Sequence, residues 1–390
     1  MEYRINPKNG DKLSILGYGC LRYTKKGAVI DQAKAEKEMA RAIALGVNYF
    51  DTAYVYRGSE ATLGKFLAKG YREQVYIATK LPHYLIKKPG DTETYFQEEL
   101  SRLQTNYVDY YLMHMLTNVE AWERLKSLNV DEWLEEKKAR GEIRAIGFSY
   151  HGGTKAFQAL IDAYPWDFCQ VQFNYMDEHS QAGIEGIRYA AARGIPVMVM
   201  EPLRGGRLAE GLPSKAKELF HKDDSSRSPA RRGLEWIWDH PEVILALSGM
   251  NDIAQVEDNA KAASERKPLT KKDLALFQAV RKEIDAVEKI HCTGCGYCQP
   301  CPQGVDIPNC FRSYNVRFSD GWFKGLKEYF MMTTLREKRS NAGQCVQCGK
   351  CKRHCPQAID IPRELAKVSR KLEGPIYRIA AGVAKKIVRF

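Results

Sequence analysis

The sequence predicts an α/β fold, a (β/α)8 TIM barrel followed by a small, mostly helical, cysteine-rich domain. Three observations in its 390 residues predict this architecture. Short apolar runs alternate with amphipathic stretches over about residues 10–265, as parallel strands alternate with their covering helices. The first run lacks the G-x-G-x-x-G turn that is typical of the rival, an open doubly wound sheet. Nine of the eleven cysteines follow residue 290.

Eight apolar runs are the predicted barrel strands. In chain order they are LSILGYG at 13, VNYFD at 47, VYIATK at 75, VDYYLMH at 108, IRAIGFS at 143, DFCQVQFN at 167, IPVMVME at 195 and VILALSG at 243. Helices are predicted between them, for example over 31–46 and 91–106, where apolar residues recur at 3–4 spacing and an initial Asp suits the N-cap. We expect the barrel to span residues 1–268.

A charged helix over 269–290 is predicted to bridge into a second domain at 291–390. This domain carries +11 of the net charge of +12, which leaves residues 1–290 nearly neutral. A basic domain suits an acidic protein partner, and we expect no nucleic-acid partner. The domain ends in a basic amphipathic helix from residue 374, which we expect to pack on the protein rather than on a membrane surface.

The location expected for the protein is cytoplasmic. The opening MEYRINPKNGDK is polar and charged, unlike the apolar core of a signal peptide. No apolar run approaches the ~20 residues that a membrane-spanning helix needs.

Polar side chains follow three of the predicted strands: Asp51, Lys80 and His114, with Tyr56 five residues after the first. Because the carboxyl ends of barrel strands meet at one mouth, we expect these four to lie together. Reducing a carbonyl requires a proton as hydride arrives, and a nearby ammonium lowers the pKa of a phenol from about 10. Asp51 can hold Lys80, while His114 can orient the carbonyl oxygen. Any one of them alone would be an ordinary surface or core residue.

The stretches FDTAYVYRGSEATLG, IATK and LMH resemble the aldo-keto reductase family, and the resemblance covers about residues 10–265. It implies a (β/α)8 barrel, a nicotinamide cofactor and a catalytic tetrad at Asp51, Tyr56, Lys80 and His114. The segments GFSYHG, QVQFNY, MEPLRGGRL and SGMNDIAQVEDNA also resemble the family. They imply cofactor contacts, from the nicotinamide end to the adenosine end, by Ser149, Gln172, Pro202, Leu203, Gly205, Ser248, Gly249, Gln255 and Asn259. An aromatic beside Gln172, such as Tyr175, is implied to stack on the nicotinamide ring.

Two departures from the family pattern affect the cofactor. Met250 and Asn251 stand where typical members carry an Arg or Lys for the 2′-phosphate of NADP, so both NADPH and NADH stay open. Tyr150 replaces the usual Asn after Ser149.

The clustered cysteines form two groups, Cys292-x2-Cys295-x2-Cys298-x2-Cys301-Pro302 and Cys345-x2-Cys348-x2-Cys351-x3-Cys355-Pro356. The spacing is typical of ferredoxins with two 4Fe–4S clusters, in which the fourth thiolate of each group binds the other cluster. The predicted sets are therefore Cys292, Cys295, Cys298 and Cys355 for one cluster, and Cys345, Cys348, Cys351 and Cys301 for the other. Cys310 is an alternative to Cys301, because the first group has two residues before its Cys-Pro where three are usual. Zinc is the alternative metal.

Together these features predict an oxidoreductase that interconverts a carbonyl and an alcohol with nicotinamide. Its clusters would exchange electrons with an acidic carrier such as ferredoxin or flavodoxin. Hydride carries two electrons and a cluster passes one, so either a bound flavin mediates or the two clusters store a pair. The alternative is an electron-transfer module with a catalytically degenerate barrel. In a further alternative the clusters are purely structural.

Overall fold

The computed structural model describes residues 1–335 and 338–387, with side chains to residue 382. Two compact units make up the chain. The first is Met1–Leu203 with Ala230–Thr270, and the second is Arg204–Pro229 with Lys271–Phe390. The predicted domain limits at 268 and 290 stay predictions. Residues 204–229 lie inside the predicted barrel range but group with the second unit.

The first unit is built on a closed barrel of eight parallel strands, as predicted, counted within the described residues. Around the barrel the order is β10-β11-β12-β3-β6-β7-β8-β9, so the last strand pairs with the first. Each predicted apolar run holds one of them: β3 (Leu16–Gly19), β6 (Tyr49–Asp51), β7 (Tyr76–Leu81), β8 (Val108–Met113), β9 (Ile143–Tyr150), β10 (Phe168–Gln172), β11 (Val197–Met200) and β12 (Val243–Ser248).

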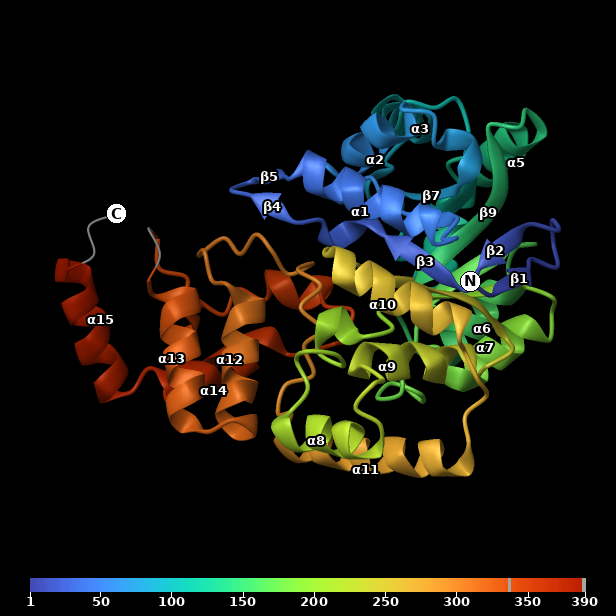
Figure 1. Cartoon of the computed structure of the whole chain (residues 1–390). Helices are drawn as coiled ribbons and strands as arrows, with labels where there is room; N and C mark the ends of the chain where they lie inside the picture. Colours follow the sequence, from blue (N-terminus) through green and yellow to red (C-terminus); the bar gives the residue numbers. More distant parts are fainter. Residues whose placement is uncertain (336–337, 388–390) are drawn as a thin grey trace. The chain divides into compact units, whose positions relative to one another are not determined.

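Helices surround these strands (Figure 1). They are α1 (Gln32–Ala44), α2 (Ser59–Leu67), α3 (Asp91–Leu103), α4 (Val119–Lys126), α5 (Val130–Ala139), α6 (Thr154–Asp162), α7 (Gly183–Ala191), α9 (Pro229–Trp238) and α10 (Ile253–Ser264). Asp31 caps α1 as predicted, because its side chain accepts a hydrogen bond from the Lys34 N–H. The N-cap predicted at Asp91 is wrong. Gly90, at φ 92°, holds that place, and the Asp91 carboxylate instead accepts from the backbone of the preceding loop.

Two short hairpins were not predicted: β1 (Tyr3–Ile5) with β2 (Lys12–Ser14), and β4 (Lys25–Lys26) with β5 (Val29–Ile30). In the turn of the first hairpin, the partly exposed Asp11 carboxylate accepts a 2.6 Å hydrogen bond from the hydroxyl of Tyr110, a residue of the barrel core. The Tyr110 ring lies edge-on between Tyr49 and Phe168, with centroids 5.2 and 5.1 Å away. The interior near the start of the strands is therefore a packed core.

The second unit joins a helix pair to a helical cluster of its own. The pair is α8 (Ser214–Asp223) and α11 (Lys271–Val287), which meet at Phe220 and Phe277 with ring centroids 5.8 Å apart. The predicted helical tail is confirmed by α12 (Ile307–Ser319), α13 (Trp322–Thr333), α14 (Ile361–Leu372) and α15 (Pro375–Ile387). None of the described helices has the length and apolar character that crossing a membrane requires.

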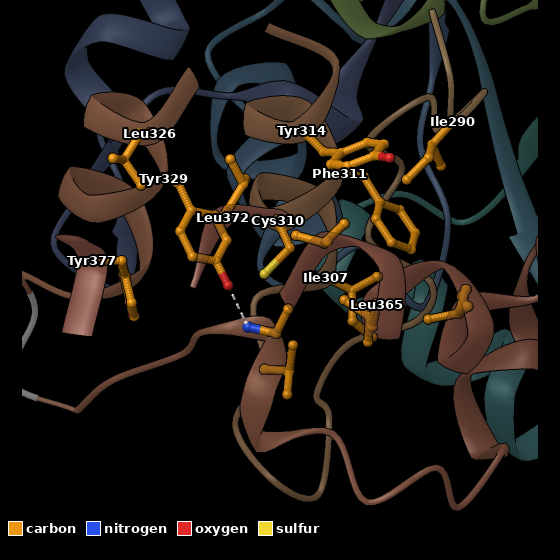
Figure 2. Close-up of a cluster of buried hydrophobic side chains, with 14 of the residues drawn as sticks. Ile290, Ile307, Cys310, Phe311, Tyr314, Leu326, Tyr329, Leu365, Leu372 and Tyr377 are labelled. Atoms are coloured by element: carbon orange, nitrogen blue, oxygen red, sulfur yellow. Dashed lines mark hydrogen bonds between the residues drawn. The ribbon is translucent and has the colours of Figure 1, made fainter. Parts of the chain in front are cut away.

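A buried apolar cluster holds the helices of the tail together (Figure 2). Cys310 and Phe311 of α12 meet Tyr329 of α13 and Leu365 of α14 in this cluster, and all four are fully buried. The Tyr329 hydroxyl accepts a 2.7 Å hydrogen bond from the Ala342 N–H, shown dashed in Figure 2.

Helix α15 packs on the same cluster through Tyr377 and Ala381, as expected for the last helix. The Tyr377 hydroxyl lies 2.7 Å from that of Thr334. Residues 388–390 of the predicted helix lie outside the described residues.

Candidate active site and cluster ligands

An ion pair between neighbouring strands forms the base of the candidate active site. Asp51 is the last residue of β6, Lys80 lies near the end of β7, and both side chains are almost wholly buried. The Lys80 ammonium donates to the Asp51 carboxylate at 2.6 Å and to the Thr52 carbonyl at 2.7 Å. Burial raises the pKa of the Asp51 carboxyl, and the Lys80 ammonium opposes that rise. The pair fixes the ammonium in one position.

The structure brings Tyr56 and His114 to the same ammonium. Tyr56 lies in the loop after β6, half-buried, with its ring centre 5.0 Å from the Lys80 nitrogen. His114 directly follows β8, and its ring stands edge-on to that of Tyr56 at 5.9 Å. Burial first, and then the Lys80 charge, hold the pKa of His114 well below its usual range. Its imidazole is therefore neutral at neutral pH.

Sequence reasoning missed two further imidazoles, those of His83 and His151, which lie near enough to His114 to add to the lowering of its pKa, after burial and the Lys80 charge. Both are buried, and burial lowers the pKa of each to about 4. His151 lies two residues after Ser149 in GFSYHG, and His83 follows Lys80 by three. Their nearness to strand ends was the available signal.

The residues implied at the nicotinamide end already bond within the chain. Ser149, near the end of β9, accepts a hydrogen bond from the Met115 N–H at 2.9 Å. The Gln172 amide donates to Asp177 at 2.9 Å and accepts from Gln181 at 2.8 Å. Tyr175 is fully buried, and the stacking of its ring on a nicotinamide stays a prediction. These bonds hold Ser149 and Gln172 in fixed orientations.

The residues implied at the pyrophosphate lie at the end of β11. Pro202 and Leu203 are buried in the first unit, and Gly205 belongs to the second. The backbone here is left-handed at Arg204, Gly205 and Gly206, with φ of 44°, 63° and 90°. Because a non-glycine residue rarely adopts such a φ, the turn holds Arg204 in a strained conformation.

The residues implied at the adenosine end are mostly bonded to one another or to nearby backbone. Asn259 donates to the Ser248 hydroxyl at 3.0 Å, and the Gln255 side chain accepts from the Asn251 N–H at 3.1 Å. Gly249 lies beside the Arg22 side chain. Met250, in the place of a typical cation, is buried.

The eight predicted cluster cysteines gather in the two predicted sets. Burial, and then the neighbouring Cys292, Cys295 and Cys355, raise the pKa of Cys298. The pKa of Cys351 is raised in the same way, by burial and then by Cys345, Cys301 and Cys348. A cavity of about 290 Å³ is lined by Cys298, Cys301, Cys345, Cys348 and Cys351, and a second, much smaller one by Cys292, Cys295, Cys298 and Cys355. No group of three or more His, Cys, Asp or Glu in the described residues is arranged to hold a single metal ion.

Cys310, the alternative ligand, lies elsewhere. Its side chain is fully buried in the apolar cluster of the tail, and its sulfur lies 3.8 Å from the Ser340 carbonyl (Figure 2). Cys301, by contrast, lines the cavity with Cys345 and Cys351. The grouping of thiols therefore favours Cys301.

Removing the Lys80 charge is expected to destabilise the barrel. Lys80→Met should lower the free energy of unfolding by about 3–5 kcal/mol in urea titrations, because it leaves the Asp51 carboxylate buried and unpaired. Lys126→Met is the control. It breaks an exposed pair with Glu123 and should change stability by less than about 0.5 kcal/mol. The double variant Lys80→Met, Asp51→Asn should recover part of the loss, and no recovery would contradict the ion-pair explanation.

Two family models match the two parts of the chain. Residues 15–282 match the model of the "Aldo/keto reductase family", and residues 291–359 match that of a "4Fe-4S dicluster domain". L-galactose dehydrogenase of Arabidopsis thaliana is 25% identical, over 74% of this chain and 94% of its own. Methylglyoxal reductase YeaE of Escherichia coli is 30% identical, over 60% of this chain and 81% of its own.

Solved structures show the same barrel. Aldo-keto reductase AKR11C1 from Bacillus halodurans superposes with a TM-score of 0.60 at 25% identity, covering 72% of this chain and 96% of its own. An aldo-keto reductase from Klebsiella pneumoniae, solved in complex with NADPH, has the same fold at 23% identity and a TM-score of 0.58, with the same coverage. The chain therefore belongs to the aldo/keto reductase family of oxidoreductases, and its barrel is followed by a 4Fe–4S ferredoxin-like domain.

Proposed function

We propose that this protein interconverts a small carbonyl compound and an alcohol with a nicotinamide cofactor, and that its clusters exchange electrons with a carrier protein. The observation that carries the proposal is the convergence of Asp51, Tyr56 and His114 on the buried Lys80 ammonium. A nicotinamide, when bound, supplies or accepts the hydride.

Each of the four side chains has one role in this proposal. Tyr56 gives a proton to the substrate oxygen as hydride reaches the carbon, and takes it back in the reverse direction. Lys80 makes the phenol a stronger acid, and Asp51 keeps the ammonium in place. The neutral His114 donates a hydrogen bond that orients the substrate oxygen.

The proposed cofactor contacts are Ser149 and Gln172 at the nicotinamide, the turn of Pro202, Leu203 and Gly205 at the pyrophosphate, and Ser248, Gly249, Gln255 and Asn259 at the adenosine. Support comes from the hydrogen bonds that hold the polar side chains among them and from the NADPH bound to the Klebsiella pneumoniae relative. The buried Met250 and the amides of Asn251 and Gln255 offer a 2′-phosphate no charge here, so NADH remains a candidate beside NADPH.

The proposed clusters are two 4Fe–4S centres. Cys292, Cys295, Cys298 and Cys355 would hold one, and Cys301, Cys345, Cys348 and Cys351 the other. The donor sets fit, because each provides four thiolates from residues that lie close together. Clusters, when bound, pass single electrons.

Electron counting constrains how the two parts work together. Oxidising the alcohol to the carbonyl releases two electrons and two protons, while a carrier such as ferredoxin takes one electron at a time. Two reduced carriers therefore balance one carbonyl. Either a flavin or the pair of clusters must therefore link the two-electron hydride step to the one-electron carrier. We infer a cytoplasmic protein with an acidic carrier as partner.

The alternative function is an electron-transfer module with a barrel that no longer turns over substrate. Met250 and Asn251, in the place of the family's usual cation, favour it. The four assembled side chains argue against it, because a degenerate barrel has no need to keep them together.

Anaerobic reduction by nicotinamide tests the proposal. NADH and NADPH would be added separately to the holoprotein while cluster absorbance and the EPR signal of reduced clusters are recorded. We expect bleaching by at least one nucleotide, and that one is the physiological cofactor. Clusters that dithionite reduces but neither nucleotide bleaches would contradict an electron path between nicotinamide and clusters.

A further inference from the structure

We propose that the electron carrier docks on the loop of residues 345–355, a basic and exposed surface around the second cysteine set, and that electrons enter and leave there. The inference rests on the proposed function, since it assumes exchange with a carrier. It adds which of the two clusters the carrier meets and what chemistry that carrier presents: an acidic protein surface.

The two cysteine sets differ in exposure. Of the eight predicted ligands, Cys348 alone is exposed, while the other seven are half-buried. Its neighbour Val346 is an apolar side chain left 61% exposed beside the cavity that the second set lines. Exposed apolar groups rimmed by polar ones are typical of protein contacts. A carrier can therefore approach the second set closely.

The two ligand loops also differ in charge. Residues 292–301 contain no charged side chain, whereas residues 345–355 contain Lys350, Lys352 and Arg353 and no acid. All three are exposed. Lys352 pairs with Asp360 at 3.0 Å, but Lys350 and Arg353 have no ion-pair partner in the described part of the chain. Unpaired surface cations beside a redox centre attract and orient an acidic partner.

The backbone of the first set is instead hydrogen-bonded within the protein. Arg207 donates to the Cys292 carbonyl and pairs with Glu288 at 2.6 Å. Arg204 pairs with the same carboxylate at 2.8 Å, and the Glu288 side chain is 5% exposed. Residues 204–207 continue the turn proposed to meet the cofactor pyrophosphate. The Cys292 end is thus bonded to Arg207 of its own unit, whereas Cys348 and its basic neighbours are exposed.

The exchange at this surface is a one-electron transfer. A reduced carrier gives one electron to the oxidised cluster and leaves oxidised, or the reverse, and no bond forms or breaks. The carrier supplies the whole redox equivalent, so nicotinamide and substrate are not needed to observe it.

Charge reversal on the loop tests the proposal. The holoprotein variant Lys350→Glu, Arg353→Glu would be mixed anaerobically with a reduced acidic ferredoxin, and cluster bleaching followed by stopped flow. We expect the second-order rate constant to fall at least about tenfold at low ionic strength, with the difference shrinking as salt is added. Lys324→Glu, Lys327→Glu on α13 changes the net charge equally and should stay within about twofold of the unmodified protein. Photoreduced deazaflavin, an uncharged small reductant, should reduce the unmodified protein and both double variants at equal rates.

Three results would overturn the proposal. Equal slowing of both variants would mean that only net charge matters. Unchanged ferredoxin rates, with binding to anionic lipid vesicles lost in the loop variant, would assign the surface to a membrane. If ferredoxin fails to reduce even the unmodified protein while deazaflavin succeeds, carrier exchange itself fails, and this result separates an error in the proposed function from an error in the docking site.

Discussion

Replacing Tyr56 by Phe should lower kcat for carbonyl reduction by about 10²–10⁴-fold, the usual contribution of general acid catalysis. The variant removes one oxygen and keeps the ring beside Lys80 and His114. Packing and substrate volume should change little, so KM should stay within a few-fold. A fall in kcat at constant KM indicates that the phenol acts in the transition state rather than in binding. Both constants would be measured by steady-state kinetics with the nucleotide that bleaches the clusters.

Tyr54→Phe is the matched control, two residues away in the same loop. Its hydroxyl donates to Glu98 at 2.7 Å on the outside of the barrel, so its loss should leave kcat within about twofold. Carbonyl turnover that survives Tyr56→Phe would contradict the tetrad mechanism. It would mean that another group supplies the proton, whereas no carbonyl turnover in the unmodified protein would favour the electron-transfer module.

The sequence was sufficient to predict the barrel because its strands are continuous apolar runs that end in turns, a pattern that depends on local residues alone. The convergence of Asp51, Lys80 and His114 followed for a related reason. Parallel strands all end at one face, so position along each strand predicts nearness without knowledge of the packing. The grouping of the thiols was predictable from the two-cluster ferredoxin signature, in which the fourth cysteine of each sequence group joins the other set.

Features that depend on contacts between distant residues were not predictable. Nothing near Asp91 shows that Gly90 would take the N-cap with a left-handed φ. The bond between Gln172 and Gln181 depends on how a loop folds back. From the sequence, Arg204 and Arg207 are ordinary cations of a turn. Their shared ion-pair partner, Glu288, lies more than eighty residues later in the chain.

Replacing Cys355 by Ala should remove one cluster and leave the other. Cys355 lies in the second cysteine group of the sequence, but its thiol gathers with those of the first. Iron content should fall from about eight to about four atoms per chain, since each 4Fe–4S cluster needs its fourth thiolate. Cys310→Ala is the control, because that thiol packs in the apolar cluster of the tail, and all the iron should remain. Iron analysis with EPR of the reduced protein measures both.

Double variants then test whether the two cysteine groups exchange their fourth ligand. If Cys298 and Cys355 hold the same cluster, replacing both by Ala should cost no more iron than replacing Cys355 alone. If Cys351 belongs to the other cluster, replacing Cys351 and Cys355 together should remove nearly all the iron. The opposite pattern, with the Cys351 and Cys355 losses overlapping, would mean that each sequence group holds its own cluster. Because the prediction rests on which losses add and which overlap, a general weakening of the domain would not reproduce it.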